Sequence, residues 1–347
     1  MKRTRALILP LLLLAAAREA LAASAGAEPF NFLFLDANAR PVAMAGAYTA
    51  LANDANALLY NPAGLAGIAR SEATFMHNQH FEGITQEYAG FAHTLGWGLN
   101  LNYLASGAIP RTTISNPSGA GLGDAHASDL ALGGGYGRAF TETLALGAGV
   151  KFIRESIAGY SGQALALDLG ALWATPRFKD LTLGAALQNI GPGVRFQSRK
   201  ESLPLNLRTG AAYRFAARGQ EGILSLDLTK ERSESLLVSV GAETRIAQVM
   251  PIRLGFGTRN DAGPGVTAGV GWNLRDVSLD YAFVPYGDLG ISHRFSVTWR
   301  FGEDLRREQD ERDRLERRHP GRKDDQSRPR KRAKRRADAP PRTAEDE

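Results

Sequence analysis

The sequence of 347 residues contains no cysteine. This absence excludes thiol catalysis, disulfide frameworks, cysteine-ligated zinc or iron–sulfur sites, and anchoring through a lipid-modified N-terminal cysteine. Beyond its N-terminus the sequence also lacks any apolar run near the roughly 20 residues that a membrane-spanning helix needs. If the mature protein lies in a membrane, it must therefore cross it as a closed β-barrel.

Excess charge of one sign is also missing from the body of the chain. Of the net charge of +6, residues 1–22 hold +3 and residues 303–347 hold +3, while the residues between them contain 22 basic and 22 acidic side chains. A nucleic-acid-binding domain needs a basic surface to match the phosphate backbone. The neutral body therefore excludes nucleic acid as its partner.

Residues 1–22 have the features of a bacterial secretory signal peptide. The segment starts with basic residues, continues as an apolar run from Ala6 to Ala17, and ends in the small-x-small tripeptide 20–22. An apolar run of about 12 residues is too short for a membrane anchor. We therefore expect this segment to be removed and the mature protein to reach the envelope of a Gram-negative type of cell.

From residue 71 to residue 302 the sequence alternates apolar residues with small or polar ones. A period of two places each set on its own side of a sheet. Segments of about ten such residues are typical of membrane strands. We therefore expect an all-β fold, a transmembrane antiparallel β-barrel of about 14 strands. The predicted strands are 71–80, 85–95, 97–105, 127–140, 142–156, 163–175, 180–190, 204–216, 221–230, 234–247, 250–260, 264–275, 276–285 and 289–301.

Periodicity alone does not separate this barrel from a soluble β-sandwich, because both alternate in the same way. The polar face, however, is small and glycine-rich, and aromatic residues lie near strand ends, as in an interfacial girdle. Several short connections also alternate with longer ones, which are 106–126, 157–162, 191–203 and 261–263. Outer-membrane barrels have short periplasmic turns and long outer loops. We therefore expect a cell outer membrane protein with both termini in the periplasm, whose partners include outer-membrane lipid and the barrel-assembly machinery.

Charged residues fall on the inward face of the predicted barrel. The luminal charges expected to matter are Lys151, Asp168, Arg208, Arg253, Asp280 and Arg294. Because buried charges must be paired or solvated, the lumen is either wet or filled by ion pairs around an internal segment. A barrel of this width is too wide to be filled by its own side chains. This favours an internal segment.

Residues 23–70 are predicted to be that segment, a helical plug or hatch inside the lumen. The stretch Arg40–Leu59 is alanine-rich and has helical character. The helix is expected to break at Asn61, because the residue before a proline leaves the helical region. Gly64 then turns the chain towards the first strand. A small periplasmic cap is the alternative.

The stretch Asn38–Ala66 resembles the N-terminal signature of the PorV/PorQ branch of the FadL-type (OMPP1/FadL/TodX) outer-membrane barrels. In that signature a Gly/Ala-rich segment leads to an aspartate and then to Asn-Pro-Ala-Gly-Leu. The matching residues are Asp54, Asn61, Pro62, Ala63, Gly64 and Leu65. The end of the last predicted strand pair, residues 286–302, is also similar. The resemblance implies a fourteen-stranded barrel with its N-terminal segment inside, and it makes the residues from Asp54 to Gly64 the candidate binding or hatch motif.

The resemblance implies two different functions. FadL-like members pass long-chain fatty acids or other hydrophobic compounds through the wall, whereas PorV-like members are accessory barrels that bind cargo or other components of a type IX-like secretion system. The luminal charges favour the second function. A structural barrel, tethered to the envelope by a basic tail, is a third alternative.

The sequence predicts no catalytic, metal or cofactor site, so a non-catalytic protein is expected. His77 and His80 are three apart on a predicted strand and therefore point to opposite faces. Asp124, His126 and Ser128 form a loop triplet without the setting of a catalytic triad. Residues 303–347 change to a highly charged composition, which predicts a largely disordered periplasmic tail.

Overall fold

The computed structural model describes residues 29–304, except for 197–198, 218–219 and 233. The chain divides into two compact units, residues 1–303 and 304–347. The predicted signal peptide and all of the predicted tail beyond residue 304 lie outside the described residues. Every element considered below belongs to the first unit.

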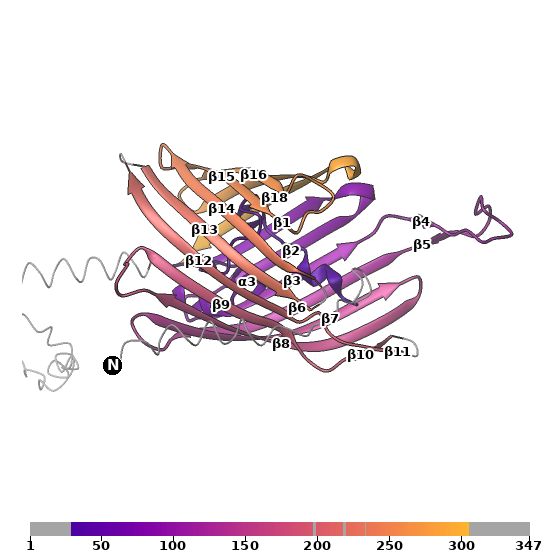
Figure 1. Ribbon diagram of the computed structural model, residues 1–347, viewed down its shortest axis with the longest axis horizontal. Coiled ribbons are helices and arrows are strands. Elements are labelled where there is room, and N and C mark those ends of the chain that lie inside the picture. The colour runs from indigo at the N-terminus through magenta and orange to yellow at the C-terminus, as the bar shows by residue number, and fades with distance from the viewer. Residues whose placement is uncertain (1–28, 197–198, 218–219, 233, 305–347) are drawn as a thin grey trace, which may run out of the picture. The chain divides into compact units, whose positions relative to one another are not determined.

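Within the described residues, fourteen antiparallel strands form a closed barrel (Figure 1). The barrel closes where β1 pairs with β18, in a register that runs from Ser71↔Phe301 to Gln79↔His293. The strand ends lie within three residues of the predicted ones, so the predicted fold class is confirmed. The barrel strands are β1 Ser71–Gln79, β2 Thr85–Ala92, β3 Trp97–Ala105, β6 Ala127–Ala139, β7 Leu144–Ile157, β8 Tyr160–Ala174, β9 Leu181–Ile190, β12 Asn206–Ala217, β13 Gln220–Glu231, β14 Leu236–Ile246, β15 Met250–Gly257, β16 Val266–Asn273, β17 Val277–Pro285 and β18 Ile291–Phe301.

The last strand illustrates how the two faces of the wall differ. On β18, Phe295 and Trp299 point outward and are 54% and 55% exposed, whereas Arg294 points inward and is 2% exposed. A soluble sandwich would place its apolar side chains inside. The closed barrel with an apolar outer face is instead the arrangement of a membrane-spanning barrel.

The connections contain small elements of their own. Residues 106–126 carry the two-stranded pair β4 Ile109–Pro110 and β5 Asp124–Ala125, which Figure 1 shows as an arm running away from the barrel. Residues 191–205 carry a second pair, β10 Val194–Phe196 and β11 Arg199–Glu201. Two 3-10 turns, η3 Phe81–Gly83 and η4 Gly287–Leu289, lie in the β1–β2 and β17–β18 connections.

One predicted loop is wrong. The connection expected at 157–162 is a turn of only two residues, because β7 continues to Ile157 and β8 begins at Tyr160. The two turn residues, Ala158 and Gly159, have φ of 52° and 95°. Two consecutive positive φ values match the twist of a tight hairpin, and glycine adopts such a value without strain.

The N-terminal segment, residues 29–70, contains four short helical pieces: η1 Asn31–Phe34, α2 Ala39–Ala43, α3 Ala57–Tyr60 and η2 Pro62–Gly67. A single alanine-rich helix over Arg40–Leu59 was therefore a wrong prediction. After α2 the chain turns at Ala45 and Gly46, both with positive φ. The amides of Tyr48 and Thr49 then bond to the carboxylate of Asp227 on β13 instead of to helix carbonyls.

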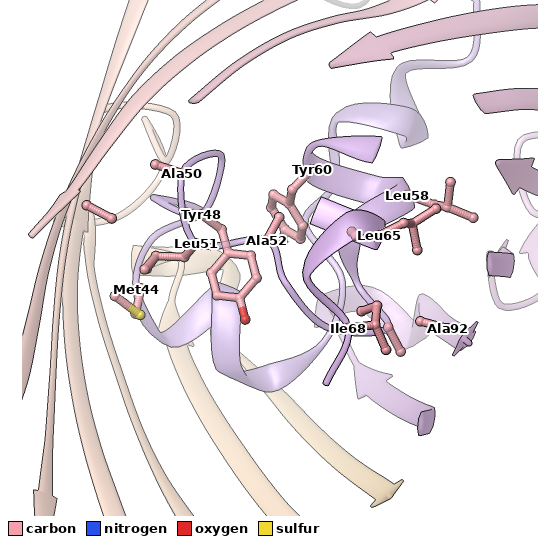
Figure 2. Close-up of a cluster of buried hydrophobic side chains, with 13 residues drawn as sticks. Met44, Tyr48, Ala50, Leu51, Ala52, Leu58, Tyr60, Leu65, Ile68 and Ala92 are labelled. Carbon is pink, nitrogen blue, oxygen red and sulfur yellow. The ribbon is translucent and has the colours of Figure 1, made fainter. Parts of the chain in front are cut away.

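This segment packs against inward-facing parts of the wall on two sides of the barrel. The α2 helix contacts β15 to β18, whereas η2 contacts β3, β6, β7 and β8. Figure 2 shows the buried apolar side chains between these pieces, among them Met44, Tyr48, Leu51, Tyr60 and Leu65. No helix among the described residues is long and apolar enough to cross a membrane.

Candidate functional site

The Asn-Pro-Ala-Gly-Leu motif begins with a fully buried asparagine that joins three pieces of backbone. The Asn61 side-chain oxygen accepts a hydrogen bond from the Ala63 amide at 3.1 Å, which caps η2. Its side-chain nitrogen donates to the carbonyl of Thr49 at 3.0 Å and to the carbonyl of Ala171 on β8 at 3.0 Å. Asn61 therefore joins two parts of the N-terminal segment to each other and to the barrel wall. An aliphatic side chain could not form these hydrogen bonds.

The rest of the motif lies against glycines of the wall. A Cβ atom added at Gly147 on β7 would lie 2.3 Å from the Pro62 carbonyl carbon, and one added at Gly170 on β8 would lie 2.1 Å from the Asn61 side-chain oxygen. Within the motif, a Cβ at Gly64 would lie 1.4 Å from the Ala52 carbonyl oxygen. Only glycine permits backbone to approach this closely. We call this contact the glycine seat.

Asp54 lies in a polar cluster on the other side of the segment. The Tyr48 hydroxyl donates to the Asp54 carboxylate, and Arg40 donates to the Tyr48 oxygen at 2.9 Å. The Arg40 Nε also donates to the Glu243 carboxylate on β14 at 2.9 Å. Burial raises the pKa of the Tyr48 phenol well above its usual value, so Tyr48 stays a neutral donor.

Two of the predicted luminal charges join the same cluster from the wall. Arg253 donates to Glu243 at 2.6 Å and to Asp280 at 2.6 Å. Together with Arg40, these residues form a buried chain of alternating charge that ties α2 to β14, β15 and β17. We call it the Glu243 cluster.

The other predicted luminal charges lie elsewhere. Arg208 donates to the carbonyl of Gly46 at 2.6 Å and lies 3.5 Å from the Asp227 carboxylate. Lys151 on β7 forms an ion pair with Asp168 on β8 at 2.8 Å. The predicted site residues therefore form several separate groups around the segment rather than one site.

Arg294 lines a cavity that is much larger than the one of about 20 Å³ beside Lys151 and Asp168. The cavity has a volume of about 290 Å³ and lies between η1, α2 and the loop ends of β15 to β18. We call it the Arg294 pocket. The residues that line it are Asn31, Phe34, Leu35, Asp36, Val42, Ala45, His80, Gly257, Arg259, Asn260, Gly265, Thr267, Val284, Tyr286 and Arg294.

The alternation of the sequence placed Arg294 inside the barrel but did not indicate the pocket. Its other polar members come from connections and from the start of the N-terminal segment, among them Asp36, His80 and Asn260. No sequence period marks such positions. Among the described residues, no group of three or more histidine, aspartate or glutamate side chains could hold a metal ion.

One protein-family model matches most of the chain. A model of an uncharacterised protein family, UPF0164, matches residues 14–283. A UPF0164 protein of Treponema pallidum (strain Nichols) is 26% identical over 209 residues, which are 54% of this chain and 53% of that protein. The chain thus spans about half the length of the curated relative that it matches.

Solved structures of the same fold are channel proteins. The CymD monoaromatic hydrocarbon channel has a TM-score of 0.53 at 12% identity and covers 78% of this chain and 99% of its own. A FadL homologue of Pseudomonas aeruginosa has a TM-score of 0.51 at 13% identity, with coverage of 76% and 98%. A deltaS2 mutant of the TodX monoaromatic hydrocarbon channel has a TM-score of 0.51 at 12% identity, with coverage of 77% and 99%. At these identities the likeness shows the fold, a FadL-like barrel.

Proposed function

We propose that this chain, which belongs to the uncharacterised protein family UPF0164, is an outer-membrane barrel that takes up a small organic compound through the Arg294 pocket. The observation that carries the proposal is the pocket of about 290 Å³ between the N-terminal segment and the wall. Ligand sites are typically concave, largely apolar and furnished with a few polar groups. The Arg294 pocket has this composition. Two of the channels with the same fold are named for monoaromatic hydrocarbons, which are small ring compounds.

The segment is proposed to be a plug whose movement opens the path. It forms one side of the pocket through Phe34, Asp36 and Val42. Its other end, η2, packs against Gly137, which lies two residues before β6 ends at a turn. The segment therefore extends from the loop end of the barrel to the turn end. A compound that enters the pocket can reach the other side only if the segment shifts.

Uptake by whole cells tests this function. A Gram-negative host that expresses the full chain would be compared with the same host carrying an empty vector, using labelled toluene, benzoate and palmitate. We expect faster accumulation of at least one compound. The proposal would be contradicted if none of the three compounds accumulated faster than in the empty-vector host, although the barrel was folded in the outer membrane. Folding is monitored by the shift in gel mobility between heated and unheated samples.

A second function, that of a secretion accessory, has one specific observation in its favour. The arm formed by residues 106–126 extends beyond the barrel and carries Ile114, whose side chain is fully exposed at 103%. Together with the motif that resembles PorV/PorQ proteins, this supports a surface for secretion-system components or cargo. Affinity purification from outer membranes in mild detergent tests it. Recovery of a free barrel with the arm present, and equally with residues 109–125 deleted, would count against this function.

The orientation, with both termini in the periplasm, belongs to the same proposal. It rests on the alternation of turns and longer connections. A protease added to intact cells should then cut within the arm at residues 106–126 and leave an epitope tag at the C-terminus uncut. Cleavage of the tag, with the arm protected, would reverse the orientation.

A further inference from the structure

Of the side chains that the structure describes, Arg294 is the largest one that is fully shielded from solvent. Among the described residues no carboxylate lies within 4.0 Å of its guanidinium, and its Nε has no hydrogen-bond partner. Other deeply buried arginines of the wall are paired, Arg208 with Asp227 at 3.5 Å and Arg253 with Glu243 at 2.6 Å. An isolated buried charge is costly. The unpaired state of Arg294 therefore indicates a site for a group that arrives from outside the chain.

The other charged groups around the pocket have partners or are neutral. Asp36 lies 3.9 Å from Arg208. Arg259 pairs with Glu231 and lies over the ring of Phe34 at 5.8 Å. Asp36 shares Arg208 with Asp227. Among the described residues, Arg294 is therefore the one charged side chain of the lining that has no opposite charge within 4.0 Å.

Two further polar atoms at the pocket lack partners. Among the described residues, neither the Nδ1 atom of His80 nor the side-chain oxygen of Asn260 has a hydrogen-bond partner. Burial and the nearby positive charge of Arg294 lower the pKa of His80 to about 4, so its ring is neutral at physiological pH. A neutral imidazole still carries one N–H donor. Arg294 and His80 can therefore both donate to one bound anion.

Aromatic rings form part of the remaining lining. His80 and Tyr286 of the lining meet edge to face with ring centroids 4.9 Å apart, and Phe81, outside the lining, packs against Tyr286 at 5.2 Å. Aromatic walls favour planar apolar groups through edge-to-face contacts. A volume of about 290 Å³ is at the lower end of the usual range for ligand pockets, roughly 300–1,000 Å³. The pocket volume therefore suits a compact ligand rather than one with a long alkyl chain.

We propose that the Arg294 pocket binds a compact aromatic carboxylate, with its carboxylate on Arg294 and its ring against Tyr286 and Phe34. The chemical class is that of benzoate and its small ring-substituted relatives. This inference rests on the proposed uptake function and specifies its cargo. It differs from a hydrocarbon site, which needs no charge, and from a site for long-chain fatty acids, which needs more length.

Calorimetric titration of the purified full-length barrel in detergent tests the inference without requiring transport. The probes are benzoate, toluene and palmitate, and the variants are Arg294→Gln, Arg294→Lys and Arg300→Gln. Arg300 is a matched control because it lies on the inner face of the same strand but is already paired with Glu72 at 3.1 Å. All variants are first checked for the gel-mobility shift of a folded barrel.

We expect benzoate to bind the unmodified barrel and Arg294→Gln to weaken its binding about 10- to 100-fold, which is the usual effect of losing a hydrogen bond to a charged group. Arg294→Lys should restore part of the affinity, and Arg300→Gln should change it less than about threefold. Benzoate affinity that is unchanged in Arg294→Gln would overturn the inference. So would toluene or palmitate binding more tightly than benzoate, although the uptake function would then stand. If no probe binds and none accumulates in cells, both proposals fail.

Discussion

The N-terminal segment meets the barrel wall in two different ways. On the side of β6, β7 and β8, the backbone of the segment rests directly on wall glycines, so the fit depends on shape. On the side of β14 to β18, α2 is held by the charges of the Glu243 cluster and borders the Arg294 pocket. Wall glycines leave no room for an added methyl group on either side, at Gly147 on β7 and at Gly255 on β15, but the second side adds the charged cluster and borders the cavity of about 290 Å³. The segment is therefore fixed by packing on both sides, and on the second side breakable ion pairs add to this packing next to the ligand space.

Removing the central acid of the charged side should have the largest effect. In Glu243→Ala, Arg40 and Arg253 lose a shared buried carboxylate, and breaking such a pair costs about 3–5 kcal/mol. Equilibrium unfolding by urea in detergent should show this loss. The control Glu221→Ala removes an exposed partner of Arg245, where we expect a change of at most about 1 kcal/mol. Equal effects of the two substitutions would contradict the assignment of the charged side as a buried cluster.

Adding one methyl group to the glycine seat should have the next largest effect. In Gly147→Ala the new Cβ would meet the backbone of Pro62, and overpacking of this kind costs about 1–3 kcal/mol. The N-terminal segment should also become more accessible to protease. Gly134→Ala is the matched control, because its Cβ would meet the tip of the Leu99 side chain at 3.3 Å and the Gly98 carbonyl oxygen no closer than 3.9 Å. A segment equally protected in both variants would show that the glycine seat is not required.

Replacing the capping asparagine should weaken function more than folding. Asn61→Ala removes three hydrogen bonds of the segment, a loss of at least about 1.5 kcal/mol, since each contributes roughly 0.5–1.5 kcal/mol net. The barrel should keep its gel-mobility shift, while accumulation of the transported compound falls. Unchanged accumulation would contradict a role of the Asn-Pro-Ala-Gly-Leu motif in the proposed hatch.

The smallest effect concerns pH. The folded state holds the pKa of His80 at about 4, below its usual value of about 6.5, so the unfolded chain binds this proton more readily. Stability should therefore fall as the pH is lowered from about 7 towards 4. His80→Gln should lose less stability over the same interval. Parallel pH curves for the two proteins, measured by thermal unfolding, would contradict this assignment.

The barrel could be predicted from the sequence because its strands obey a local rule. On β18 the two-residue period alone places Arg294 inside and Trp299 outside. The turn at Ala158 could not be predicted, because an alanine with positive φ gives no compositional signal. Strand positions and faces were thus accessible to sequence reasoning, while one turn geometry was not.

The conformation of the N-terminal segment could not be predicted, because distant residues determine it. The alanine content of residues 40–59 favours a helix. The amides of Tyr48 and Thr49, however, donate hydrogen bonds to the carboxylate of Asp227, which lies nearly 180 positions away in the sequence. The pocket was inaccessible for the same reason. His80 and Tyr286 come from connections about 200 residues apart in the sequence, and only the closed barrel brings them together.

The most direct test of the central claim, that the segment must shift on the pocket side for a compound to pass, is a reversible cross-link. The Cβ position at Gly257 lies 3.2 Å from the Cβ atom of Ala45, so a shift of a few tenths of an ångström gives the roughly 3.5–4.5 Å of a disulfide, and the sequence has no cysteine that could interfere. In cells that express Ala45→Cys/Gly257→Cys, we predict that accumulation is lost on oxidation and restored by a reductant, whereas accumulation in each single variant does not change between the oxidised and reduced states. Equal accumulation in the oxidised and reduced states, with the disulfide verified by mass spectrometry, would contradict the account.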